Sequence, residues 1–85
     1  MPTVLEKTFK DACETVKTST KDISNQAKLN FYSLFKQAKD GNVQGDRPGV
    51  FSQVARAKWD SWNALKGITK EQAMQKYIDY VNKEL

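Results

Sequence analysis

Two clusters that combine aromatic rings with lysines lie on either side of a glycine-rich segment of this sequence. The first contains Tyr32, Phe35 and Lys36, and the second contains Lys58 and Trp59. A ring beside an ammonium group suits a nucleotide, because the ring stacks on the base while the cation pairs with phosphate. The segment between the clusters does not have the Gly-Lys-Ser/Thr ending of a phosphate-binding P-loop. We therefore expect a ligand that offers a flat ring, phosphates and an apolar tail.

The excess positive charge lies in the same part of the chain. Residues 28–58 contain six basic and two acidic side chains, and the rest of the chain contains eight of each, so the whole net charge of +4 falls in this window. An anionic partner is expected to dock there. A plainer interpretation is a wide core stripe with lysines extending along its edge. For the complete aromatic and lysine face we favour ligand binding.

The composition argues against several kinds of chemistry. The chain has no histidine, which removes the usual zinc sites and every Ser–His or Cys–His nucleophile pair. Cys13 is the only cysteine, so we expect no internal disulfide and a reducing, cytoplasmic compartment. No apolar run approaches the roughly 20 residues of a membrane span, and charged residues interrupt the N-terminal stretch where a signal peptide would lie. We predict no catalytic residues, no metal site and no cofactor.

Hydrophobic periodicity predicts a single all-α domain of four helices over residues 1–85. Capping-box spacing, Thr3 with Glu6 and Thr69 with Gln72, marks the starts of the first and fourth helices. The second helix is expected over residues 25–39, with Ser24 or Asp22 as its cap and Gly41 just past its end. Residues 40–49 contain three glycines and a proline and predict an ordered surface loop. The expected fold is an antiparallel four-helix bundle with a long loop between helices two and three.

Each predicted helix has an apolar stripe at three- and four-residue spacing. The stripes are Leu5, Phe9, Ala12, Cys13 and Val16; Ala27, Phe31, Leu34 and Ala38; Val54, Ala55, Trp59, Trp62 and Leu65, ending at Gly67; and Met74, Tyr77, Ile78 and Val81. We interpret both tryptophans as core residues and Cys13 as a small buried hydrophobe. Tyr77 suits the core, a groove wall or both.

Charged residues of the loop and the third helix have structural interpretations as well. Arg47 either binds an anion or pairs with Asp46 or a helix carboxylate, and the pairing is the commoner outcome. Asp40 and Asp60 are interpreted as capping or salt-bridge residues. Lys58 belongs to the basic window and is therefore the stronger ligand candidate of its cluster.

The sequence resembles the acyl-CoA-binding protein family over nearly its whole length. The matching segments are, in order, FYSLFKQAKDG, GDRPG, AKWDSWNALKG and KEQAMQKYI. The resemblance implies a four-helix domain that binds long-chain fatty acyl-CoA esters and carries them through the cytosol as a monomer. It also implies an absence of catalysis.

The resemblance further implies a role for individual residues. Tyr32, Lys36 and Lys58 match positions that hold the nucleotide end, chiefly the ribose 3′-phosphate, and Lys17 matches a basic position near the phosphates. Phe35 stands where most members have a tyrosine associated with the adenine, so it can stack but offers no hydroxyl. Tyr77 matches a tyrosine that contacts the ligand. The remaining matches are acyl-channel positions, at Phe9, Cys13 and Leu29. Cys13 stands where the family usually has alanine, and Val54 stands where it often has lysine.

Three other functions compete with this interpretation. A nucleic-acid-binding module would explain the pI of about 9.3, but no helix-turn-helix or zinc pattern is recognised, so nucleic acid is not expected as a partner. A membrane-surface or protein-interaction module would bind lipid without depending on the coenzyme A headgroup. At most transient contact with membranes or acyl-CoA-using enzymes is expected. An acyl-CoA hydrolase is disfavoured by the missing histidine and by carboxylates that form no identifiable acid–base pair.

Overall fold

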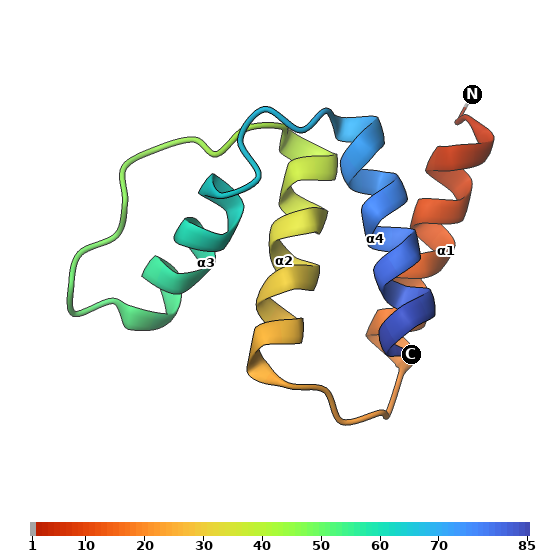
Figure 1. Cartoon of the computed structure of the whole chain (residues 1–85), viewed down its shortest axis with the longest axis horizontal. Coiled ribbons are helices and arrows are strands. Elements are labelled where there is room, and N and C mark those ends of the chain that lie inside the picture. The colour runs from red at the N-terminus through yellow and green to blue at the C-terminus, as the bar shows by residue number, and fades with distance from the viewer. Residues whose placement is uncertain (1) are drawn as a thin grey trace.

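The computed structural model describes residues 2–85, which form four helices and no strand (Figure 1). The helices are α1 (Val4–Thr18), α2 (Asn25–Asp40), α3 (Gln53–Asn63) and α4 (Lys70–Glu84). They lie side by side in the order α3, α2, α4, α1, in a flat molecule with extents of 39 × 30 × 17 Å. The all-α four-helix prediction is confirmed. Within residues 2–85, no helix combines the length and the apolar character needed to cross a membrane.

The predicted helix starts are formed by side-chain caps. Both capping boxes are present, with Thr3 and Glu6 opening α1 and Thr69 and Gln72 opening α4. Of the two candidate caps for α2 it is Ser24 that accepts a hydrogen bond, from the backbone N–H of Ala27 at 3.1 Å. These caps satisfy backbone donors that the first helical turn leaves without partners. The sequence therefore determined three of the four helix starts locally.

The connections decide which helices meet. The backbones of α2 and α4, α1 and α4, and α2 and α3 pack against each other, whereas those of α1 and α2 do not approach closely. α2 runs antiparallel to α1 and α4, and the long loop of residues 41–52 returns along the molecule so that α3 runs in the same direction as α2 (Figure 1). Gly41, with φ +80°, permits the turn out of α2 because it has no Cβ.

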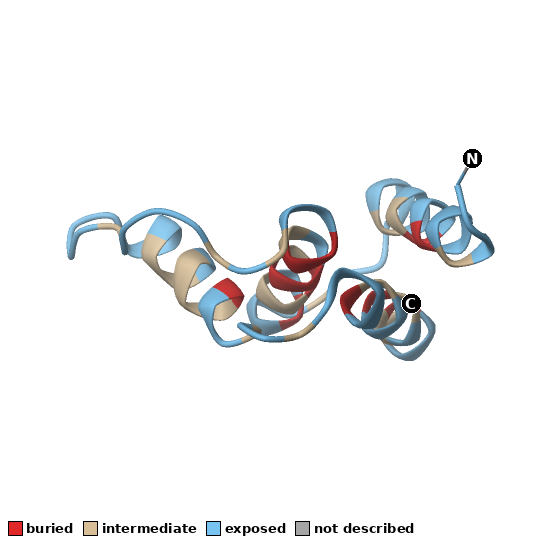
Figure 2. Cartoon of the chain, turned by 90° about the horizontal axis from the view of Figure 1, so that it is seen from above, coloured by how far each residue is buried: buried red, intermediate tan, exposed pale blue. Residues whose placement is uncertain are grey.

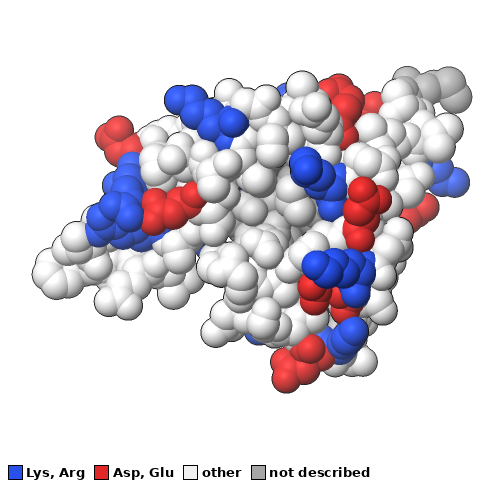
Figure 3. All heavy atoms as spheres, in the orientation of Figure 1, with Lys and Arg blue, Asp and Glu red and all other residues white. Residues whose placement is uncertain are grey.

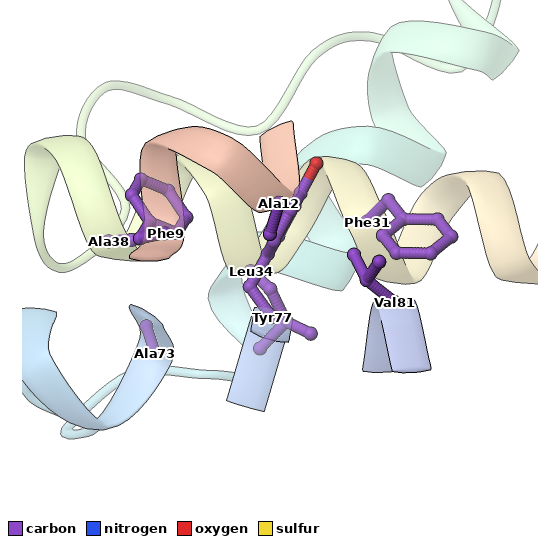
Figure 4. Packing of buried hydrophobic residues seen from close by; sticks show 8 residues of the cluster. All are labelled: Phe9, Ala12, Phe31, Leu34, Ala38, Ala73, Tyr77 and Val81. Carbon is purple, nitrogen blue, oxygen red and sulfur yellow. The ribbon is translucent and has the colours of Figure 1, made fainter. Parts of the chain in front are cut away.

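The buried core lies between α1, α2 and α4. Figure 4 shows side chains from these three helices converging in one cluster. Its members are Phe9, Ala12, Phe31, Leu34, Ala38, Ala73, Tyr77 and Val81. The Phe31 ring meets Tyr77 and Tyr80 edge to face, with ring centroids 5.4 and 4.7 Å apart. The predicted stripe of the second helix is fully buried, which confirms it.

The predicted stripe of the third helix is partly wrong. Val54 is 70% exposed and Ala55 is also exposed, whereas Trp62 is buried. Figure 2 shows that most of α3 is exposed or partly buried. The reason is that α3 packs against α2 alone, so much of its circumference has no neighbour. The helix also ends at Asn63 instead of continuing to Gly67, because its last turn tightens into i→i+3 hydrogen bonds. Leu65 therefore lies beyond α3, partly buried against the core.

Two features of the interior were not predicted. Ala73 of α4 is completely buried, while Met74 and Ile78 of the predicted stripe are only partly so. Gln37 is also completely buried, and its amide donates to the carbonyl of Ile68 at 2.7 Å and to Asn42 at 2.9 Å. Gln37 thus ties the end of α2 to the segments before and after α3.

Candidate ligand-binding site

Three hollows follow one another across the face of α2. The α2–α3 hollow, of about 420 Å³, is lined by Leu29, Tyr32, Val54 and Lys58 among others. The central hollow, of about 350 Å³, is lined by Cys13, Val16, Lys17, Phe31, Tyr32, Phe35 and Tyr77. The α1 hollow, of about 410 Å³, includes Phe9, Cys13, Phe35 and Met74 in its wall. Eight of the nine predicted site residues therefore line at least one of these hollows. The ninth, Lys36, lines none of them.

The three hollows are neighbours that share wall residues. Tyr32 borders both the α2–α3 hollow and the central hollow, and Cys13 and Phe35 border both the central hollow and the α1 hollow. The space exists because α1 and α2 meet through side chains instead of through closely packed backbones. Phe9 and Phe35 form such a contact, stacked with ring centroids 6.2 Å apart. The result is a groove with aromatic walls that crosses α2.

The lysine and aromatic clusters meet at the α2–α3 end of this groove. The Lys58 ammonium lies 5.2 Å from the centre of the Tyr32 ring, which is close enough for a cation–π interaction. Lys28 borders the same hollow, one helical turn before Tyr32. The fold thus brings the Lys58 ammonium to the Tyr32 ring, although the two residues are 26 positions apart in the sequence. Such a corner can hold an anion beside a planar group.

Lys36 lies next to this corner in an ion pair. Its Nζ is 2.6 Å from Asp40 and 5.0 Å from the centre of the Trp62 ring. The hydrogen bond between Lys36 and Asp40 raises the pKa of the lysine and lowers the pKa of the carboxyl. Lys36 is therefore a cation that already has a partner within α2, at Asp40.

Arg47 has a structural partner. Its guanidinium donates two hydrogen bonds to the carboxylate of Asp60, at 2.8 and 2.7 Å. The hydrogen bonds raise the pKa of Arg47 and lower the pKa of Asp60. The prediction of a helix carboxylate as partner is confirmed, and so is the prediction that Asp40 and Asp60 form salt bridges. This pair fastens the long loop to α3.

Tyr77 is both a core residue and a groove wall. Its ring packs edge to face on Phe9 at 5.2 Å and also lines the central hollow. Burial raises the pKa of its hydroxyl, and burial likewise raises the pKa of the half-buried Cys13 thiol. Both groups therefore stay protonated near neutral pH. No group of three or more His, Cys, Asp or Glu side chains within residues 2–85 is arranged to hold a metal ion.

Some groove residues were not selected from the sequence. Lys28 and Val54 line the α2–α3 hollow, and Lys39 lines the α1 hollow. The sequence could have indicated both lysines as site residues, because each shares a helical face with Tyr32 or Phe35 at three- or four-residue spacing. For Val54 the signal was the family resemblance, since it stands where lysine is often found, but its apolar character and spacing equally suit a core position.

Comparison with known proteins decides the family. The family described as acyl CoA binding protein matches residues 6–81 of this sequence. The chain belongs to the acyl-CoA-binding protein family. The crystal structure of acyl-CoA-binding protein 2 from Oryza sativa superposes with a TM-score of 0.90 at 44% identity, covering 94% of this chain and 89% of that one.

Curated relatives place the family domain in proteins of different length. Acyl-CoA-binding protein homolog 3 of Caenorhabditis elegans is 46% identical over 92% of this chain, which spans 71% of that protein. Human enoyl-CoA delta isomerase 2 is 44% identical over 91% of this chain, which spans 20% of that enzyme. The similarity to the isomerase is thus limited to a segment of family-domain size.

Proposed function

We propose that this protein binds long-chain fatty acyl-CoA esters in the groove across α2 and carries them without chemical change. The observation that carries the proposal is that the α2–α3 hollow, where the Lys58 ammonium lies over the Tyr32 ring, is followed by two neighbouring hollows with aromatic and aliphatic side chains in their walls. An acyl-CoA has the matching parts, since a phosphorylated nucleotide is joined to a long hydrocarbon chain. Family membership supports the same ligand class.

We assign the nucleotide end to the side of the groove near α3. Tyr32, Lys36 and Lys58 hold the ribose 3′-phosphate, and Phe35 stacks on the adenine. Lys17 and Tyr77, which line the central hollow, contact the rest of the headgroup. The acyl chain follows the wall that contains Phe9 and Cys13. Leu29, the third residue that the family resemblance implies for the acyl chain, lines the α2–α3 hollow together with Tyr32 and Lys58 and therefore contacts the ligand near its nucleotide end.

Simple magnitudes divide the binding energy between the two ends of the ligand. Burying about a dozen methylenes at about 0.8 kcal/mol each contributes up to roughly 10 kcal/mol. Each charge-assisted hydrogen bond to phosphate contributes only about 1.5–3 kcal/mol. The acyl tail therefore supplies most of the affinity, and the nucleotide determines which apolar ligands are accepted.

Binding without turnover is part of this proposal. The chain contains no histidine, and the carboxylates of Asp40 and Asp60 are held by Lys36 and Arg47. A carboxylate in such a pair is a weak base, because its pKa is lowered. Action as a cytoplasmic monomer belongs to the same proposal, and the lone cysteine suits a reducing compartment.

Calorimetric titration with palmitoyl-CoA, run beside palmitate and free coenzyme A, tests the proposal. We expect tight one-to-one binding of the ester, and far weaker binding of palmitate and coenzyme A because each lacks one half of the contacts. An absence of heat with the ester, for protein shown to be folded by circular dichroism, would falsify the proposed function. Equal affinity for the ester and for palmitate would show that the nucleotide corner is not used.

A further inference from the structure

The loop between α2 and α3 ends in an exposed apolar tip, which consists of Val50, Phe51 and Val54. Phe51 is 99% exposed, Val54 70% and Val50 62%. Val50 and Phe51 lie in the turn that is closed by a hydrogen bond of 2.9 Å from Ser52 N–H to the Gly49 carbonyl, and Val54 lies in the first turn of α3. Apolar side chains scattered singly on a surface need no explanation, but three within five residues form a patch that calls for a partner.

The shape of the tip limits the kinds of partner. The turn into α3 forms a projecting corner of the molecule, at the lower left of Figure 1. The same corner in Figure 3 carries no charged atoms on the visible face, and both basic and acidic side-chain atoms lie close to it. A stable interface with a folded protein buries about 800 Å² on each side, which three projecting side chains do not offer. A small convex apolar tip suits insertion into lipid instead.

Basic side chains lie beside the tip. Lys28 and Lys58 border the same hollow as Val54. Asp46 lies in the same loop, and the charge of Arg47 is matched by Asp60. The two lysines therefore outnumber the one remaining carboxylate. An apolar patch with a cationic rim is the pattern of surfaces that bind anionic membranes.

We propose that the tip of Val50, Phe51 and Val54 docks this protein on anionic phospholipid membranes, with the apolar side chains in the interfacial region and Lys28 and Lys58 facing lipid phosphates. Val54 belongs both to the tip and to the wall of the α2–α3 hollow. Docking therefore places the groove opening at the membrane surface. Docking does not depend on the proposed function. Passage of an acyl-CoA between the membrane and the groove in this pose does rest on it.

Co-flotation with vesicles tests the docking. The vesicles are of phosphatidylcholine, alone or with about one-third phosphatidylserine. The test variant is the double substitution Val50→Ser with Phe51→Ser, which removes two exposed side chains outside the predicted ligand contacts. The matched control is Val4→Ser, which removes an 84% exposed valine from the start of α1, at the opposite end of the row of helices.

We expect wild-type protein and Val4→Ser to bind the anionic vesicles equally and the neutral vesicles more weakly. The double variant should have a partition coefficient onto anionic vesicles that is lower by roughly tenfold or more, because burial of a phenylalanine contributes at least that factor. Binding of the double variant equal to wild type overturns the proposal, as does failure of the wild type to bind anionic vesicles. Sedimentation that shows wild-type dimers which the double variant abolishes reassigns the tip to a second copy of the chain and also overturns it.

A parallel measurement separates this proposal from the proposed function. Palmitoyl-CoA affinity, measured by calorimetry without vesicles, should be the same for the double variant and wild type. Unchanged affinity together with lost vesicle binding supports docking as a distinct property. If the wild type binds vesicles through the tip but takes up no palmitoyl-CoA, docking stands and the proposed function fails.

Discussion

The α1–α2–α4 side of the molecule and the α3 side are held together in different ways. On the first side, aromatic and aliphatic side chains from three helices meet in one buried cluster. On the second side, α3 contributes Trp62 as its buried residue and depends on a few polar contacts, including Trp62 to Gly41 and Arg47 to Asp60. The first side supplies most of the buried core, and the second supplies one wall of the α2–α3 hollow. Local stability in proteins varies in this way with the density of buried apolar contacts.

The largest expected effect comes from the core side. Phe31→Ala removes a ring that contacts Tyr77 and Tyr80, and we expect a loss of about 3–5 kcal/mol in the free energy of unfolding. Urea unfolding followed by circular dichroism measures it. The exposed Phe51→Ala serves as a control that should change stability little. Similar losses for both variants would contradict the assignment of the core to this side.

A ligand contact on the α3 side should affect binding and leave folding almost unchanged. Lys36→Ala is expected to weaken palmitoyl-CoA binding by about 1.5–3 kcal/mol, which is roughly tenfold or more, because a charge-assisted contact to phosphate is lost. Calorimetry measures the affinity, and Lys83→Ala, at the end of α4, provides a lysine control.

Phe35→Tyr should change the same affinity less than Lys36→Ala, because it adds a hydroxyl and keeps the ring. An unchanged affinity after Lys36→Ala would remove this lysine from the site. A larger effect of Phe35→Tyr would show that the ring, and not the cation, dominates the nucleotide corner.

The two tryptophans of α3 offer a matched pair for the polar contacts on that side. Trp62 Nε1 donates to the Gly41 carbonyl at 2.8 Å, whereas Trp59 Nε1 is buried without an acceptor in residues 2–85. Trp62→Phe should therefore lower the free energy of unfolding by about 1–3 kcal/mol, since it strands a carbonyl. Trp59→Phe should cost less, because it removes an unsatisfied donor. Equal costs in urea unfolding would mean that the Gly41 contact does not hold α3 in place.

The smallest expected effect is the pH dependence of the Arg47–Asp60 pair. The hydrogen bonds from Arg47 lower the folded-state pKa of Asp60 below its unfolded value, so the pair stabilises above about pH 4 and its contribution is lost as the pH falls through the folded-state pKa. Asp60→Asn should reduce this acid dependence slightly, and both carboxyl and guanidinium are exposed enough that the neutral-pH effect stays small. Thermal melts between neutral and acidic pH measure it, with Asp46→Asn as control. An identical dependence in wild type and Asp60→Asn would argue that the pair is not formed in solution.

Local signals in the sequence were sufficient for part of this structure. The capping boxes at Thr3 and Thr69 and the apolar stripe of α2 depend on residues within a few positions of each other. The family resemblance likewise followed from contiguous segments, and it named the residues that line the groove. The contacts of Gln37 could not be found in this way, because they join residues 31 positions apart. A polar residue on an apolar face gave no indication of what it would meet.

The sequence by itself determined where three of the four helices begin, which face of α2 is apolar, and that the excess charge lies in residues 28–58. The tertiary structure decided that α3 packs on α2 alone, which exposes Val54 and places Lys58 over Tyr32. It also decided that α1 and α2 stand far enough apart to leave a groove between their side chains. The physical reason is that periodicity specifies which face of a helix is apolar, whereas the partner of that face is set by the long loop and by packing between distant segments.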